Sequence, residues 1–183
     1  MPDIRPLLPL EDDGLRLRAM TDADALPYAL GSEDPLVKTF AHLPLSHYSE
    51  QLMRTLIATD IEQGLTRGNL LILTLAETEQ DRFIGSLVLY DISQQRAEVG
   101  YWLLPFARGL GLAAKGLALA ATLAKKMQLC TLDARTSPDN TASARTLLKA
   151  GFKAQGPAQK EKAPSGELGL FVPYRLELHS ASE

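Results

Sequence analysis

Hydrophobic and polar residues alternate with a period of two in several separate stretches of the chain. Residues 15–18 read Leu-Arg-Leu-Arg, as in a half-buried strand, and residues 21–24 then supply a capping start for a helix. Strand-like stretches follow at residues 69–76, 82–90 and 97–104, and the polar segments between them are short enough for antiparallel hairpins. This part of the chain therefore predicts a strand, a helix and a three-stranded meander.

Apolar residues at helical spacing mark the remaining elements. One helix is predicted from Glu50 to about Gln63, ending at Gly64, and a longer helix, apolar on nearly every side, at residues 109–127. The strand before this long helix and a further strand at residues 129–136 predict a parallel crossover, because parallel neighbours need such a connection.

The C-terminal third predicts one more helix and one more strand. Asn140 caps the helix and Gly151 ends it, while alternating apolar residues predict a strand at residues 170–178. Residues 156–169 are rich in Pro, Lys and Gly and are expected to be a loose segment.

Length and composition fit one folded domain spanning residues 1–183, and the order of predicted strands and helices places it in the α/β (α+β) class. The chain has 183 residues and 45% hydrophobic content, with neither an internal repeat nor a dividing linker. Its net charge of -3 gives no bulk attraction for nucleic acid or for an anionic membrane. The single cysteine, Cys130, cannot form an internal disulfide, which favours the cytoplasm. A homodimer formed through the final strand is left open.

The segment PFARGLGLAAKGLALAATL, residues 105–123, is the strongest chemical signal in the sequence. Its glycines stand where a strand passes into a helix, and a helix start offers unpaired N–H groups that bind phosphate well. The segment lacks the Gly-Lys-Ser/Thr of a P-loop, and its glycines do not fall in the G-x-G-x-x-G frame of a dinucleotide fingerprint. It carries instead an Arg-x-x-Gly-x-Ala frame at residues 108–113. The alternative is that the glycines only let the helix pack closely on the sheet.

Together with two further motifs, this frame resembles the GNAT superfamily of acyl-coenzyme A-dependent N-acyltransferases. The motifs are Ala-Glu-Val-Gly-Tyr-Trp-Leu at residues 97–103, and Asn140 and Ser143 in an Asn-x-x-Ser frame followed by Gly-Phe at residues 151–152. They are most similar to the branch of Rim-type ribosomal-protein N-terminal acetyltransferases. The resemblance implies a mixed central sheet of about seven strands, helices on both faces, and a splay between the family's fourth and fifth strands.

The resemblance also implies that acetyl-coenzyme A is the acyl donor and which residues hold it. The pyrophosphate would lie on the N–H groups of the segment that follows Pro105, namely Arg108, Gly109, Leu110, Gly111, Leu112 and Ala113. The pantetheine arm would pair with strand groups near Trp102, Leu103 and Leu104. Asn140 is either a contact of the coenzyme or a helix cap.

Acyl transfer to an amine needs a base for the ammonium, a donor to the thioester oxygen and an acid for the thiolate. Glu98 is the expected base, with a solvent-facing strand residue as the equal alternative. The N–H of Leu103 is the expected oxyanion donor. The tyrosine that usually serves as the acid is Leu147 here, so Ser143 is expected to replace it, with helix capping as the alternative.

A primary amine is the expected acceptor. The branch resemblance implies a protein N-terminus, with aminoglycosides or polyamines as the alternative and a non-catalytic coenzyme A sensor as a third hypothesis. The three histidines, His42, His47 and His179, are scattered singly, so no metal is expected.

Overall fold

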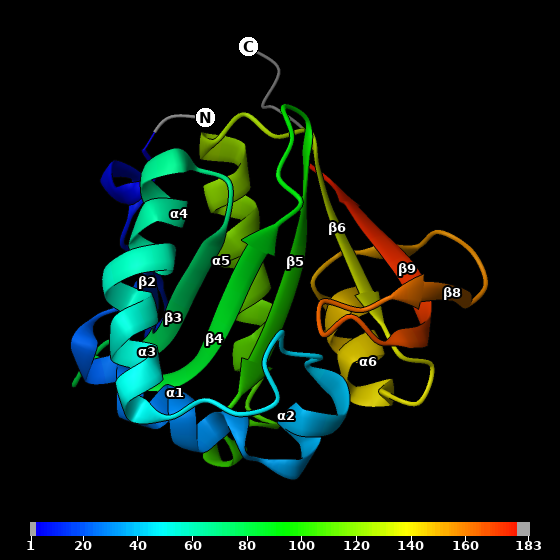
Figure 1. Ribbon diagram of the computed structural model, residues 1–183. Coiled ribbons are helices and arrows are strands. Elements are labelled where there is room, and N and C mark those ends of the chain that lie inside the picture. The colour runs from blue at the N-terminus through cyan, green and yellow to red at the C-terminus, as the bar shows by residue number, and fades with distance from the viewer. Residues whose placement is uncertain (1–2, 179–183) are drawn as a thin grey trace.

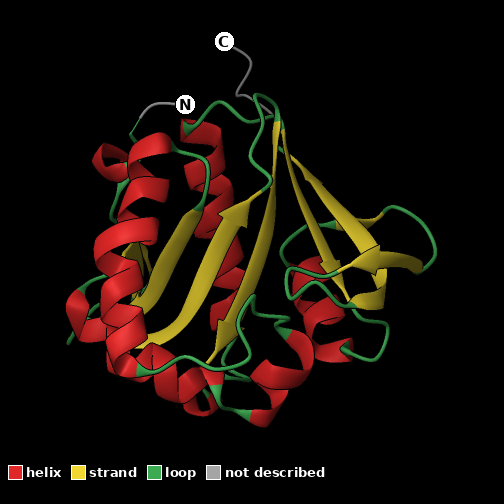
Figure 2. Cartoon of the chain, in the orientation of Figure 1, coloured by secondary structure: helices red, strands yellow, loops and turns green. Residues whose placement is uncertain are grey.

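One mixed β-sheet runs through the whole fold and carries helices on both of its faces (Figures 1 and 2). The computed structural model describes residues 3–178, so His179 lies outside the described residues. The strands are β1 (Leu10–Asp12), β2 (Leu15–Ala19), β3 (Leu71–Glu77), β4 (Arg82–Tyr90), β5 (Arg96–Leu103), β6 (Thr131–Thr136), β7 (Lys153–Ala154), β8 (Gln159–Lys162) and β9 (Leu168–Glu177).

The strand order is β1-β2-β3-β4-β5-β6-β9-β7, with β8 paired to β9. Nine strands are therefore present among the described residues, more than the seven or so expected. The additional strands are short, and β8 lies in the segment expected to be loose. Its sequence, Gln-Lys-Glu-Lys, has no apolar alternation, so backbone pairing with residues 168–171 and not hydrophobic burial makes it a strand.

The sheet is antiparallel except between β5 and β6, and these two strands separate along their length. They pair in parallel only at Arg96–Thr131, Ala97–Leu132 and Glu98–Asp133. Beyond this three-pair junction the strands diverge, as Figure 1 shows. The predicted splay is confirmed, and we call the space between the two diverging strands the gap.

The helices include one that differs from its prediction. They are α1 (Ala25–Ser32), α2 (Pro35–Phe40), α3 (Glu50–Leu56), α4 (Glu62–Arg67), α5 (Leu112–Lys126) and α6 (Thr141–Lys149), with a π-helical turn at Ile57–Ile61 and 3-10 turns at Arg5–Leu7, Asp22–Asp24 and Pro105–Ala107. The helix expected to end at Gly64 continues to Arg67 and ends on Gly68, whose φ is 64°. A Cβ on Gly64 would lie 2.2 Å from the Leu70 carbonyl oxygen, so this glycine allows close packing and does not end the helix.

The two faces of the sheet carry different helices. α5 packs against β1, β2, β5 and β6 on one face, and α6 lies beside it (Figure 1). On the other face, called the front face, α1 and α3 cover an aromatic cluster in which the rings of Tyr28 and Trp102 are 5.1 Å apart. A Cβ on Gly31 would lie 2.7 Å from Trp102, so α1 sits directly on β5. Within residues 3–178, none of the helices has the length and apolarity that a bilayer span requires.

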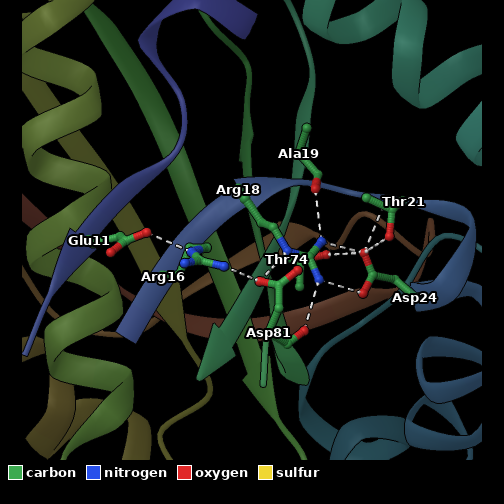
Figure 3. Close-up of polar contacts among 8 residues, drawn as sticks. All are labelled: Glu11, Arg16, Arg18, Ala19, Thr21, Asp24, Thr74 and Asp81. Carbon is green, nitrogen blue, oxygen red and sulfur yellow. Dashed lines mark hydrogen bonds and ion pairs between the residues drawn. The ribbon is translucent and has the colours of Figure 1, made fainter. Parts of the chain in front are cut away.

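A buried ion pair holds the start of α1 on the front face (Figure 3). Arg18 of β2 donates from both terminal nitrogens to Asp24, at 2.6 and 3.0 Å. Asp24 also accepts from the Thr21 N–H and from the Thr74 hydroxyl, and its exposed fraction is 2%. Arg18 reaches Asp81 at 3.0 Å as well. This network joins β2, β3 and the turn before α1.

Candidate active site

A cavity of about 770 Å³ lies between the front-face helices and the gap. Its front part is lined by residues 28–90, from α1, α2, α3, the π turn, β3, β4 and the loop before α3. Its gap part is lined by residues from 99 to 171, which come from β5, the turn after it, α5, β6, α6, β9 and the loop before β9. Seven residues of the predicted site line the gap part: Trp102, Leu103, Arg108, Gly109, Ala113, Asn140 and Ser143. Five do not line the cavity: Glu98, Leu104, Leu110, Gly111 and Leu112.

The glycine segment has the geometry of an anion cradle. Gly109 and Gly111 have φ angles of 77° and 76°, in the left-handed region that favours glycine. Gly111 caps α5, whose first intrahelical bond runs from the Lys115 N–H to the Gly111 carbonyl at 3.2 Å. The N–H groups of Leu112 and Ala113 precede that bond, so they have no partner within the helix.

A cation that the sequence did not reveal lies beside this cradle. A Cβ on Gly111 would lie 3.6 Å from Lys149 Nζ, while one on Gly109 would meet no atom within 4 Å. An open glycine backbone, unpaired helix N–H groups and an ammonium together fit a diphosphate. Lys149 stands in the last turn of α6, and only the packing of α6 against α5 brings it to the start of α5.

Arg108 contributes differently from expectation. Its N–H donates to the Pro105 carbonyl oxygen at 3.3 Å, so this group is already paired and is not a free member of the cradle. Its side chain donates to the Leu103 carbonyl oxygen at 3.0 Å and to Asp34 at 2.6 Å. Asp34 in turn caps α2 through the Leu36 and Val37 N–H groups. The hydrogen bond from Arg108 lowers the pKa of Asp34 below its ordinary value. Arg108 thus ties the glycine segment to α2.

The pairing of β5 decides which backbone groups face the gap. The Leu104 N–H donates to the Ile84 carbonyl oxygen at 2.8 Å, and the register pairs Trp102 with Ser86 in the same orientation. Trp102 therefore directs its backbone groups at β4, while Leu104 uses its N–H toward β4 and its carbonyl oxygen to accept from the Ala107 N–H at 3.0 Å, so neither residue is free to pair with a ligand in the gap, contrary to expectation. Leu103, between them, directs its N–H into the gap.

The hydroxyl of Ser143 has a partner that was not predicted. Asn140 Oδ1 accepts from the Ser143 N–H at 3.1 Å, so Asn140 caps α6 and the Ser143 hydroxyl is not needed for that. This hydroxyl lies 3.1 Å from the hydroxyl of Tyr101, and both residues line the cavity. Burial raises the pKa of Tyr101. A phenol from β5 therefore reaches the site where Leu147, 1% exposed, replaces the usual tyrosine.

Glu98 lies on the front face at the junction of β5 and β6. Its side chain is only 17% exposed, so the alternative of a solvent-facing strand residue does not hold. Its carboxylate accepts from Arg135 Nε at 2.7 Å and from the Tyr90 hydroxyl. Burial raises the pKa of Glu98, although the bonds from Tyr90 and Arg135 oppose this effect. Tyr90 and Arg135 line the cavity, whereas Glu98 does not.

The front part of the cavity is mainly apolar. Leu36, Phe40, Met53, Leu56 and Ile72 are among its lining residues. The π turn, a distortion frequent at functional sites, contributes Asp60 and Ile61 to the same lining. Among the described residues, no group of three or more His, Cys, Asp or Glu could hold a metal ion.

Comparisons with known proteins bear on the family and the fold. A family model described as an acetyltransferase (GNAT) domain matches residues 14–153. Comparison with curated protein sequences gave no match.

Three solved structures illustrate the shared fold. Ribosomal-protein-S5-alanine acetyltransferase from Vibrio fischeri has a TM-score of 0.79 at 16% identity, over 96% of this chain and 100% of its own. RimJ from Mycobacterium smegmatis, in complex with CoA-disulfide, has a TM-score of 0.77 at 19% identity, over 93% of this chain and 86% of its own. Spermidine N-acetyltransferase from Vibrio cholerae, in complex with CoA and spermine, has a TM-score of 0.76 at 15% identity, over 91% of this chain and 97% of its own. On the match over residues 14–153, the chain belongs to the GNAT family of acetyl-coenzyme A-dependent acetyltransferases.

Proposed function

We propose that this acetyltransferase acts on the N-terminal α-amine of a peptide or protein whose first residues are apolar. A ribosomal protein is the acceptor class that the Rim-type similarity suggests. The observation that carries the proposal is the lining of the front part of the cavity. Among its described residues, Asp60 is the one carboxylate, and most of the others are aliphatic or aromatic.

Charge separates this acceptor from the main alternative. A polyamine or an aminoglycoside brings several ammonium groups, and each loses hydration on entering an apolar cavity unless a carboxylate compensates. A peptide N-terminus brings one ammonium, and its first side chains can bury apolar surface. Its α-amine has an ordinary pKa near ~8, against ~10.4 for an alkylamine, so far less free energy is needed to obtain the neutral nucleophile.

The chain's own residues have distinct roles in this proposal. Acetyl-coenzyme A supplies the activated acetyl group. The glycine segment, with Lys149, holds its diphosphate, and Asn140 keeps the capped start of α6 at the gap. The Leu103 N–H donates to the acetyl oxygen, where such a donor contributes about 3 kcal/mol. Ser143, held by Tyr101, donates a proton to the departing sulfur.

A thiol-release assay with acetyl-coenzyme A tests the acceptor. The panel pairs peptides that begin with Ala, Leu or Met with the same peptides carrying a blocked N-terminus, and adds peptides that begin with Asp, spermidine and an aminoglycoside. We expect turnover with free, apolar N-termini and mass spectrometry that places the acetyl group on the α-nitrogen. Preferred turnover of spermidine or of the aminoglycoside would refute the proposed acceptor. The homodimer and the cytoplasmic location stay predictions.

A further inference from the structure

The side chain of Arg108 connects the end of β5 with the start of α2. Its Nε donates to the Leu103 carbonyl oxygen at 3.0 Å, and its Nη2 donates to Asp34 at 2.6 Å. The side chains of Arg108 and Asp34 are only 29% and 14% exposed, so water screens this pair less than it would a pair on the open surface. Arg108 and Leu103 line the gap part of the cavity, whereas Asp34 caps a helix of the front part.

On the gap side, Arg108 holds the last residue of β5. The N–H and carbonyl oxygen of one strand residue point to the same edge, so the bond from Arg108 lies at the edge where the Leu103 N–H faces the gap. The last ladder pair between β5 and β6 is Glu98–Asp133, and Leu103 lies beyond it. The guanidinium therefore takes the place of the ladder partner that β6 no longer provides.

On the front side, Arg108 holds the cap of a short helix. Asp34 accepts from the N–H groups of Leu36 and Val37 at 3.0 and 3.2 Å, and both of these residues line the front part of the cavity. The helix α2 spans only Pro35–Phe40. Because so short a helix is marginal without tertiary support, its place depends strongly on its cap and on what holds that cap.

These bonds commit the Arg108 guanidinium to the protein itself. The planar guanidinium directs its N–H donors in fixed directions, so it keeps Leu103 and Asp34 at a set separation. The N–H of Arg108 is likewise bonded, to the Pro105 carbonyl oxygen. A diphosphate on the glycine segment is left to the open start of α5 and to Lys149. Arg108 therefore acts on the reaction through other groups.

We propose that Arg108 is a positioning residue that keeps the Leu103 N–H in register with α2, one wall of the acceptor site. The inference rests on the proposed function, because it takes the Leu103 N–H as the donor to the acetyl oxygen and the front part of the cavity as the acceptor site. The amine and the acetyl carbon must approach within ~3–3.5 Å, and a misplacement of 1 Å can cost ~100-fold in rate. Loss of this register lowers the rate of transfer more than it weakens the binding of the donor.

The central variant is Arg108→Lys. Lysine has a methylene where arginine has Nε, so the variant keeps a positive charge near Asp34 and loses the donor to Leu103. We expect kcat to fall at least tenfold, the Kd of coenzyme A to stay within about twofold of its wild-type value, and Tm to change little. Asp34→Asn retains a good helix cap and loses the charge, so it should raise KM for the acceptor several-fold with a smaller loss of kcat.

Arg82→Lys is the matched control. The Arg82 guanidinium lies 4.6 Å from the ring centroid of Phe106, in the turn between β5 and Arg108, and pairs with Glu77. It has no bond to Leu103 or Asp34 among the described residues. This variant should leave kcat, KM and the Kd of coenzyme A unchanged.

A second measurement does not depend on turnover. In a bisubstrate analogue, an acetyl bridge joins the sulfur of coenzyme A to the nitrogen of the acceptor, so the molecule gains affinity only where both sites are in register. By calorimetry, wild type should bind this analogue at least 100 times more tightly than coenzyme A. In Arg108→Lys that advantage should fall at least tenfold.

Three results would overturn the inference. They are a kcat within about threefold of wild type in Arg108→Lys, an undiminished advantage of the bisubstrate analogue in that variant, and a Kd of coenzyme A raised tenfold or more in Arg108→Met, which would make Arg108 a contact of the ligand. Every measurement uses whichever amine the wild-type enzyme acetylates. A failed peptide assignment and a failed role for Arg108 are therefore separate outcomes.

Discussion

Replacing Asp24 by asparagine is expected to destabilise the fold strongly. The substitution keeps the shape of the side chain and removes the charge that Arg18 faces in Figure 3. The side chains of Asp24 and Arg18 are 3% and 11% exposed, so the guanidinium would lose its closest buried partner. Breaking one partner of such a pair typically costs ~3–5 kcal/mol. Because Asp81 remains bonded to Arg18, we expect the lower end, about 3 kcal/mol.

That loss can be followed by thermal and urea unfolding. In a domain of this size, 1 kcal/mol corresponds to ~2–4 °C, so Tm should fall by about 6–12 °C. Arg16→Met is the control, because Arg16 makes ion pairs with the more exposed Glu11 and Asp81 and should cost at most ~1 kcal/mol.

A double variant tests whether the cost comes from an uncompensated charge. Arg18→Met together with Asp24→Leu removes both charges, and apolar replacement of a buried pair is often nearly neutral. The double variant should therefore be more stable than Asp24→Asn. A loss below about 1 kcal/mol in Asp24→Asn would refute this reasoning. So would a double variant whose loss of stability equals the sum of the losses caused by its two substitutions made singly. Because the pair positions the start of α1, Asp24→Asn should also raise KM for the acceptor.

Four further substitutions probe the site. Gly111→Ala should cost ~1–2 kcal/mol of stability, because the φ of this residue is positive, and should raise the Kd of acetyl-coenzyme A, measured by calorimetry, at least tenfold. Lys149→Met should raise the same Kd with little change in Tm. Unchanged affinity for acetyl-coenzyme A in both variants would refute the diphosphate cradle. Ser143→Ala should lower kcat about tenfold or more. Its Tm should change little, because Asn140 and not the Ser143 hydroxyl caps α6. A lower Tm with unchanged kcat would favour a structural role for Ser143. The pKa of Asp34 is lowered by Arg108, so this pair contributes stability above about pH 4 that is lost as pH falls through the lowered pKa. Urea unfolding should therefore show wild type and Asp34→Asn converging below about pH 4, and a constant difference from pH 3 to 7 would contradict this assignment.

The sequence predicted the elements that bury much apolar surface. The meander, α5 and the crossover to β6 were predicted because dense apolar periodicity and few alternative pairings defined them. The polar strand β8 and the continuation past Gly64 were missed, because the first depends on backbone pairing and the second on the close approach of Leu70. Both are set by tertiary contacts that local sequence does not record.

The candidate site divides in the same way. The glycine segment and the orientation of the Leu103 N–H were predictable because they depend on one strand, one turn and one helix start. The approach of Lys149 to Gly111 and the Tyr101–Ser143 contact were not. Each joins elements far apart in sequence, and no short motif carries them.

The short junction between β5 and β6 has a consequence for how the fold opens. Beyond three ladder pairs, the C-terminal strands and α6 are joined to the rest by α5 and by ion pairs that include Glu98–Arg135 and Arg96–Asp133. Such a boundary is expected to divide the protein into two cooperative units for hydrogen exchange, with amides of β6 and β9 exchanging while β2–β4 stay protected. An acyl donor in the gap bridges the two units, so its binding should slow exchange first in β6 and β9.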